Sequence, residues 1–157
     1  VSVFAKSRTA LVNIETEDTG VAVITFRNGA LGVVEATTAT RPKDLEGSLS
    51  ILGEKGSVEI GGFAVNEMKV WNFAGHEDES KAVLEQFHEM PPNVYGFGHR
   101  LYLENVCESI LNDTKALVDG LEGRESLELI NAIYESIETG REVHLRFQAE
   151  KCRLGRR

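Results

Sequence analysis

The sequence predicts an α+β fold. We expect a largely antiparallel open sheet of five to six strands, with two helices on one face and the other face used for oligomerisation. Three observations predict it. Short β-branched runs separated by turn residues fill the first half of the chain, residues 100–139 have helical periodicity, and the hairpin at residues 21–37 is apolar on both faces.

A first strand is expected at Val1–Ala5, and a hairpin follows at residues 21–37. Asn28-Gly29 separates the two halves of this hairpin and favours a two-residue turn, because both turn positions take φ > 0. Such a turn would place Phe26 opposite Leu31. Further strands are expected at Ser48–Leu52, Ser57–Ile60 and Met68–Phe73.

Neither face of the hairpin shows the alternation of polar residues that is typical of a sheet with one solvated face. Two helices can cover one face of the sheet, and the second apolar face then needs a partner. Large exposed apolar patches are rare on monomers, so we expect a homodimer or tetramer formed through this face.

Two helices are predicted from apolar residues spaced i, i+3, i+4 and i+7. The first runs from about Arg100 to Leu111, and the second from about Glu125 to Thr139, with Gly140 as its C-cap. Residues 74–93 are expected to form a loop with a short helix around residues 81–87. A short final strand is predicted from the alternation of Val143, Leu145 and Phe147.

Composition narrows the classes of function. A formal net charge of −8 argues against nucleic-acid binding, because phosphate contacts need clustered Lys and Arg, and the basic residues cluster only in the tail at residues 148–157. Cys107 and Cys152 have no CxxC spacing, which favours a reducing, cytoplasmic location. The four histidines show no metal-ligand spacing, so no metal site is expected, and no apolar run is long enough to span a membrane.

Two segments are candidates for ligand binding. The first, residues 37–43, places Arg41 and Lys43 beside a row of threonines at a strand end, and the Arg41 guanidinium could pair with a carboxylate or phosphate. An ordinary polar loop is the alternative. The second, residues 93–99, leads into a helix amino terminus that could bind an anion, with His99 as a further donor. A capping role for His99 is the alternative there.

Two other motifs are not assigned a function. Gly96-Phe97-Gly98 lacks the third glycine of a dinucleotide-binding motif and follows Pro91-Pro92 rather than a strand. The acidic cluster formed by Glu15, Glu17 and Asp18 is interpreted as a solvated turn.

Residues 1–145 resemble the carboxy-terminal domain of the Gfo/Idh/MocA oxidoreductases in the order of their strands, helix-initiating Gly-His and Val-Asp-Gly turn. The similarity is greatest to the dehydrogenases that oxidise UDP-N-acetylglucosamine or its uronic acid at C3. The stretches that carry this closer resemblance are residues 17–23, 28–32, 42–46 and 91–99.

The resemblance implies that residues 1–147 are the substrate-binding and oligomerisation domain of an enzyme whose amino-terminal Rossmann domain is absent here. That domain would bind NAD or NADP, and this fragment is expected to bind neither and to be inactive alone. The ligand would be a sugar or sugar nucleotide, and this chain would supply no catalytic residue. By similarity, the substrate-binding residues are Arg41, Tyr95 and His99, with Asn93 and Lys43 as weaker candidates.

A stand-alone dimeric binding or scaffold module without catalysis remains the alternative function. It would use the same apolar sheet face. The two hypotheses differ in whether a dinucleotide-binding domain precedes the strands in the natural protein.

Overall fold

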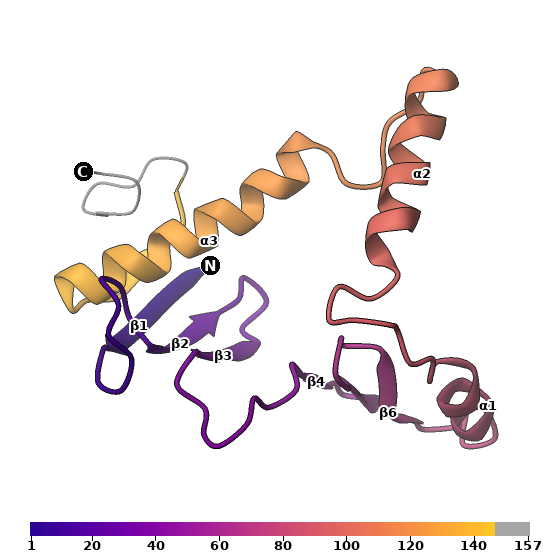
Figure 1. The fold of residues 1–157 in the computed structure, drawn as a ribbon, viewed down its shortest axis with the longest axis horizontal. Coiled ribbons are helices and arrows are strands. Elements are labelled where there is room, and N and C mark those ends of the chain that lie inside the picture. Colours follow the sequence, from indigo (N-terminus) through magenta and orange to yellow (C-terminus); the bar gives the residue numbers. More distant parts are fainter. Residues whose placement is uncertain (147–157) are drawn as a thin grey trace. The chain divides into compact units, whose positions relative to one another are not determined.

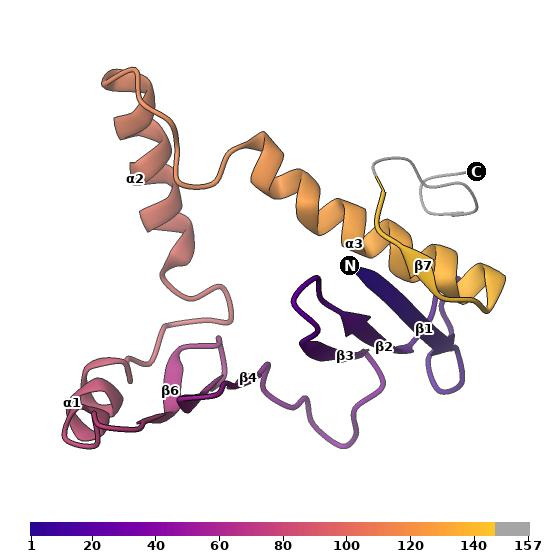
Figure 2. The same ribbon diagram turned by 180° about the vertical axis from the view of Figure 1, so that it is seen from behind.

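The computed structural model describes residues 1–146 of the chain (Figures 1 and 2). It divides into two compact units, one formed by Val1–Arg41 with the chain from Val118 onward, and the other by Pro42–Leu117. The predicted basic tail at residues 148–157, and Phe147 of the predicted final strand, lie outside the described residues.

The first unit contains a four-stranded antiparallel sheet in the order β3-β2-β1-β7. Its strands alternate exposed and buried side chains, which is the period-two pattern of a sheet covered on one face. The α+β fold with antiparallel strands is therefore confirmed. The bounds of these strands are Ser2–Arg8 (β1), Thr19–Thr25 (β2), Leu31–Thr37 (β3) and Val143–His144 (β7).

The turn between β2 and β3 differs from the predicted two-residue turn. Phe26 N donates to Ala30 O at 2.9 Å and Gly29 N donates to Phe26 O at 3.0 Å, so the loop contains three residues. Gly29, with φ 87°, takes the left-handed conformation that closes such a loop. The register shifts by one residue, and Thr25 rather than Phe26 lies opposite Leu31.

Helix α3 (Gly120–Thr139) covers one face of this sheet and packs on β1 and β7 (Figures 1 and 2). It begins five residues before the predicted start because the Asp119 side chain caps it, accepting from Leu121 N and Glu122 N. Gly140, with φ 66°, ends the helix as predicted. The buried apolar core between the two layers is formed by Val3, Ala5, Ala22, Ile24, Ala132 and Val143.

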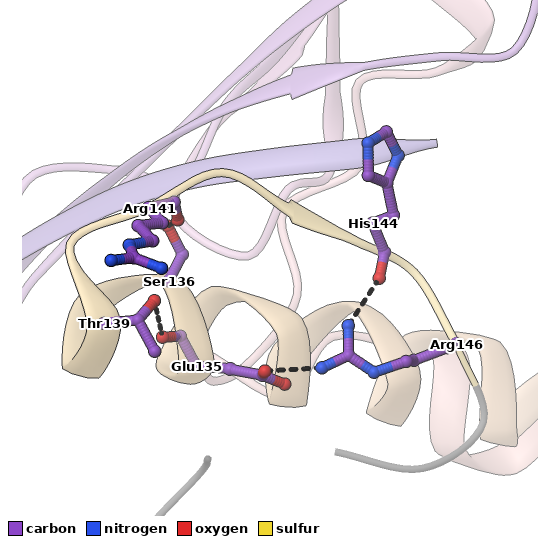
Figure 3. A network of polar contacts seen from close by, with 6 residues as sticks. All are labelled: Glu135, Ser136, Thr139, Arg141, His144 and Arg146. Atoms are coloured by element: carbon purple, nitrogen blue, oxygen red, sulfur yellow. Dashed lines mark hydrogen bonds and ion pairs between the residues drawn. The ribbon is translucent and has the colours of Figure 1, made fainter. Parts of the chain in front are cut away.

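Polar contacts join α3 to β1 and to the segment around β7. The buried Ser136 hydroxyl accepts from Ala5 N at 2.9 Å and donates to Arg141 O at 2.6 Å, so it joins the helix to β1 and to the turn before β7. Glu135 is 5% exposed, and Arg146 pairs with it at 2.5 Å while also donating to His144 O (Figure 3). The buried carboxylate is thus paired, as burial of a charge requires.

The second face of the four-stranded sheet is exposed in the single chain and combines apolar side chains with the charged residues Lys6 and Glu35. It carries β1, β2 and β3 side chains whose exposed fractions are 41% for Phe4, 44% for Val21, 44% for Val23, 74% for Leu31 and 72% for Val33. We call these five residues the sheet-face patch. The alternation of the strands places them together, because their neighbours Val3, Ala5, Ala22 and Ile24 point into the core.

The second unit contains a three-stranded antiparallel sheet, in the order β4-β5-β6, and two helices. Helix α1 packs beside β6, and helix α2 buries a single side chain, Ser109. The bounds are Leu49–Leu52 (β4), Gly56–Gly61 (β5), Glu67–Phe73 (β6), Glu79–Gln86 (α1) and Gly98–Leu111 (α2).

In two details the structure corrects the predicted arrangement. The strands form two sheets rather than one, because β4 pairs with β5 and not with β3, and residues 38–48 between β3 and β4 form no strand. One helix, α3, covers the four-stranded sheet, whereas α2 belongs to the second unit.

Among the described residues, no helix combines the length and the apolar character needed to cross a bilayer.

Candidate functional site

The segment between α1 and α2 is folded around Asn93. The Asn93 side-chain oxygen accepts from Tyr95 N at 3.0 Å, and its carbonyl accepts from Gly96 N at 3.2 Å. These bonds form an Asx-type turn, a conformation that asparagine favours because its side chain replaces one backbone turn. Gly96, with φ 64°, allows the chain to reverse into α2. Asn93 therefore positions Tyr95.

Tyr95 and His99 form an aromatic pair at the start of α2. Their ring centroids are 5.9 Å apart with an interplanar angle of 82°, an edge-to-face contact. Tyr95 is 72% exposed, so its side chain is accessible to solvent. The structure thus brings together three of the five predicted residues: Asn93, Tyr95 and His99.

The amino terminus of α2 adds backbone donors beside this pair. Its N-cap residue, Phe97, makes no side-chain cap bond, and no acidic residue lies in the first turn. The first N–H groups of a helix have no partner within the helix, and together with the helix dipole they favour an anion. Arg100 lies in this turn but pairs with Glu104 at 3.0 Å. An anionic group beside Tyr95 and His99 would meet favourable charge here.

The other two predicted residues lie on the connection between the units. Arg41 is the last residue of the first unit before Pro42, and its guanidinium donates to Thr40 O at 2.7 Å. Lys43 lies at the start of the second unit. Both side chains are exposed.

Gly96-Phe97-Gly98 has no dinucleotide-binding geometry. The residues before Gly96 form a turn rather than a strand, and Gly98 is already the first residue of α2. A dinucleotide site needs a strand leading into a glycine-rich turn and a helix. Within residues 1–146 no group of three or more His, Cys, Asp or Glu side chains is arranged to hold a metal ion.

The interpretation of the acidic cluster as a solvated turn is wrong for two of its members. Asp18 is 2% exposed, and its carboxylate accepts from the backbone N–H groups of Ala10, Leu11 and Val12. These bonds lower the pKa of Asp18 from 3.8 to about 2, Leu11 contributing most. Glu17 accepts from the Tyr134 hydroxyl at 2.5 Å. Both residues stabilise the β1–β2 loop.

Asn66 is a residue of this region that the sequence analysis missed. Its side chain joins the β5–β6 turn to Glu89, four residues before Asn93. The available signal was weak: Gly61-Gly62 followed by Asn66 indicates a turn, but nothing in the sequence shows that its amide reaches a residue 23 positions away.

A family model described as the oxidoreductase family, C-terminal alpha/beta domain, matches residues 1–145. The chain belongs to the Gfo/Idh/MocA oxidoreductase family. The resemblance inferred from the sequence is thereby confirmed. No curated protein sequence matches the chain.

Solved structures support the same assignment. The WlbA dehydrogenase from Bordetella pertussis, in complex with NADH and UDP-GlcNAcA, is 42% identical with a TM-score of 0.79 over 92% of this chain and 42% of that chain. The WlbA dehydrogenase from Chromobacterium violaceum, with the same two ligands, is 43% identical with a TM-score of 0.76 over 94% of this chain and 40% of that chain. Levoglucosan dehydrogenase in complex with NADH and L-sorbose, at 20% identity and a TM-score of 0.70, shares the fold.

The Gfo/Idh/MocA domain described here spans less than half the length of these relatives, between 40% and 44% of their chains. It matches the C-terminal alpha/beta domain of the oxidoreductase family. Within it, the cluster at Asn93–His99 combines exposed aromatic rings, a histidine and the amino terminus of α2, which has no side-chain cap.

Proposed function

We propose that this domain is the substrate-binding and oligomerisation half of an NAD-dependent dehydrogenase that oxidises a UDP-N-acetyl sugar, a uronic acid in particular, at C3. The observation that carries the proposal is the 42% identity, over 92% of the chain, to a dehydrogenase solved with NADH and UDP-GlcNAcA. At this level of identity both the fold and the character of the site are expected to be retained.

The chemistry of the candidate residues supports an anionic sugar nucleotide. UDP-GlcNAcA carries a diphosphate and a carboxylate. The planar guanidinium of Arg41 can form two hydrogen bonds with a carboxylate or phosphate, and the amino terminus of α2 favours an anion. Tyr95 and His99 offer an aromatic surface and a donor for the sugar or the uracil ring. Asn93 and Lys43 complete the proposed binding set, and all five bind and orient the ligand.

The cofactor would accept the hydride, and a dinucleotide-binding domain outside these residues would hold that cofactor. Residues of that domain would select NAD or NADP. In this proposal the present residues supply no acid or base. The isolated domain is therefore expected to form no NADH.

We further propose that the sheet-face patch is the interface between copies of the protein. An apolar surface of five neighbouring side chains from three strands is unusual on a monomer, and a second copy presents the same self-complementary surface. A cytoplasmic location follows from the proposed NAD chemistry.

The test is NADH formation by the full-length protein with UDP-GlcNAcA, followed at 340 nm. UDP-glucuronic acid, which lacks the N-acetyl group, is the control substrate. The Arg41→Ala variant is expected to raise KM for the sugar nucleotide by about tenfold, the effect of one lost charge-assisted hydrogen bond, and to change kcat little. Absence of NADH formation from every UDP-sugar would refute the proposal and favour a binding module without catalysis.

A further inference from the structure

We propose that the β5–β6 turn, residues 61–66, positions the two ligand-binding segments of the second unit, and that Asn66 is the positioning residue. The inference rests on the function proposed above. It assigns a role to a residue that makes no contact with the aromatic pair itself.

The turn has a strained backbone. Val65 has φ 54°, a left-handed conformation that is rare for a β-branched side chain, and Gly62 has φ 92°. A left-handed residue other than glycine costs about 1–2 kcal/mol and persists only where surrounding contacts hold it. Val65 is 53% exposed, so burial of its side chain does not explain the conformation. The contacts that hold the turn must come from elsewhere.

Two side chains supply those contacts. The Asn66 side-chain oxygen accepts from Ala64 N at 2.9 Å, inside the turn. Glu46 accepts from Gly62 N at 2.8 Å and forms an ion pair with Lys69 of β6. Glu46 lies three residues after Lys43, so this second contact fixes the segment that carries Lys43.

Asn66 also fixes the segment that carries Asn93, Tyr95 and His99. Its amide nitrogen donates to Glu89 O at 2.8 Å. Glu89 is followed by the buried Pro91 and then by the Asn93 turn. Gly96 lies against the same β5–β6 turn, because a methyl group added at Gly96 would meet the Cβ and carbonyl oxygen of Ala64 at 3.9 Å.

One amide therefore performs two tasks that need different groups. Its oxygen holds the strained turn, and its nitrogen holds the approach to the ligand-binding loop. Asparagine offers both an acceptor and two donors at this length, whereas aspartate offers the acceptor alone. The Asn66→Asp substitution thus keeps the turn bond and removes the bond to Glu89 O.

Because Asn66→Asp removes one of the two hydrogen bonds, it distinguishes a positioning role of Asn66 from a purely structural role in the turn. If Asn66 only stabilises the turn, Asn66→Asp leaves KM for the sugar nucleotide unchanged. If it positions the ligand-binding loop, Asn66→Asp weakens sugar-nucleotide binding although the turn bond to Ala64 N is kept. Asn72→Asp is the matched control, because Asn72 lies in the same strand, β6, is exposed, and receives the same added charge.

The experiment compares native full-length protein, Asn66→Asp, Asn66→Ala and Asn72→Asp by steady-state kinetics with UDP-GlcNAcA and NAD, and by thermal unfolding. Both Asn66 variants are expected to raise KM for UDP-GlcNAcA about tenfold, with kcat and KM for NAD within about twofold. Both Asn66 variants should unfold below the native temperature, Asn66→Asp because a carboxylate oxygen then faces the Glu89 carbonyl oxygen, and Asn66→Ala because both bonds are lost. Asn72→Asp should match the native protein in every value.

A second measurement needs no activity. Hydrogen–deuterium exchange at residues 93–97 should be faster in Asn66→Asp than in the native protein, since the bond to Glu89 O no longer restrains the loop. Native KM and native exchange in Asn66→Asp would overturn the inference alone. A native protein that neither binds nor oxidises UDP-GlcNAcA would overturn the proposed function and, with it, this inference.

Discussion

The Asp18 carboxylate lies 2.6 Å from the backbone nitrogen of Leu11 and accepts a hydrogen bond from it. Two further N–H groups, from Ala10 and Val12, point at the same oxygen. Three backbone N–H groups of the loop between β1 and β2 thus converge on the Asp18 carboxylate. The three donors explain why the buried carboxyl remains ionised.

The first prediction concerns acid stability. The folded-state pKa of Asp18 is about 2, below its ordinary value of 3.8, so its contribution to stability is present above pH 4 and is lost as the pH falls towards 2. The substitution that tests this is Asp18→Asn, because asparagine cannot ionise. Urea unfolding from pH 5 to pH 2 should show a smaller pH dependence in this variant.

The control for this prediction is Asp113→Asn. Asp113 is exposed and has φ 51°, a conformation that asparagine also tolerates. Its pH dependence should match that of the native protein. If Asp18→Asn and the native protein lost stability in parallel between pH 4 and pH 2, the role assigned to the Asp18 charge would be wrong.

The second prediction concerns the link between α3 and the same loop. Tyr134 donates to Glu17 at 2.5 Å across 117 residues of sequence. Tyr134→Phe should lower the free energy of unfolding by about 1.5–3 kcal/mol, the usual net value of a hydrogen bond to a charged group. Tyr102→Phe, at a side chain 52% exposed on α2, is the control and should have no effect. The loss should vanish on a Glu17→Ala background; a full loss on that background would contradict the assignment.

Much of the fold could be predicted because it depends on local periodicity. The expected first strand includes Val3 and Ala5, and the structure buries both. Helical spacing identified Ile133 and Ile137, which pack on the core, as members of one face of α3. Leu127 has the same helical spacing but is 58% exposed, because only the second half of α3 lies over the sheet.

The remaining features depend on geometry that sequence patterns do not encode. Asn28-Gly29 is compatible with loops of two or three residues, and the choice shifts the register by one. The burial of Asp18 requires three loop N–H groups to converge, and the role of Asn66 requires a contact with Glu89. In the candidate site, residue types could be predicted, whereas the Tyr95–His99 contact could not.

The third prediction uses the strain in the β5–β6 turn. Val65→Asn should raise the free energy of unfolding by about 1 kcal/mol, because asparagine adopts the left-handed conformation at lower cost and the side chain loses little burial. Thermal unfolding measures the change. The control is Val94→Asn, at a valine 56% exposed with negative φ, which should not be stabilised. A lower unfolding temperature for Val65→Asn would show that the backbone is not strained there.

The fourth prediction concerns the sheet-face patch. Val33 is 72% exposed at the edge of the hairpin in the single chain, so Val33→Lys should leave the fold intact. In a symmetric interface the same substitution occurs twice and buries two unpaired charges, which is strongly unfavourable. We therefore expect Val33→Lys to raise the dimer dissociation constant by about a hundredfold or more, measured by sedimentation velocity at micromolar concentrations.

Leu52→Lys is the control for that measurement. Leu52 is 87% exposed on β4 in the second unit, so the variant makes the same apolar-to-charged change away from the patch. It should sediment as the native protein does. The sheet-face patch would not be the interface if Val33→Lys had the native dimer dissociation constant, or if the native protein were monomeric at micromolar concentration. Another partner or a ligand would then have to cover five exposed apolar side chains on neighbouring strands.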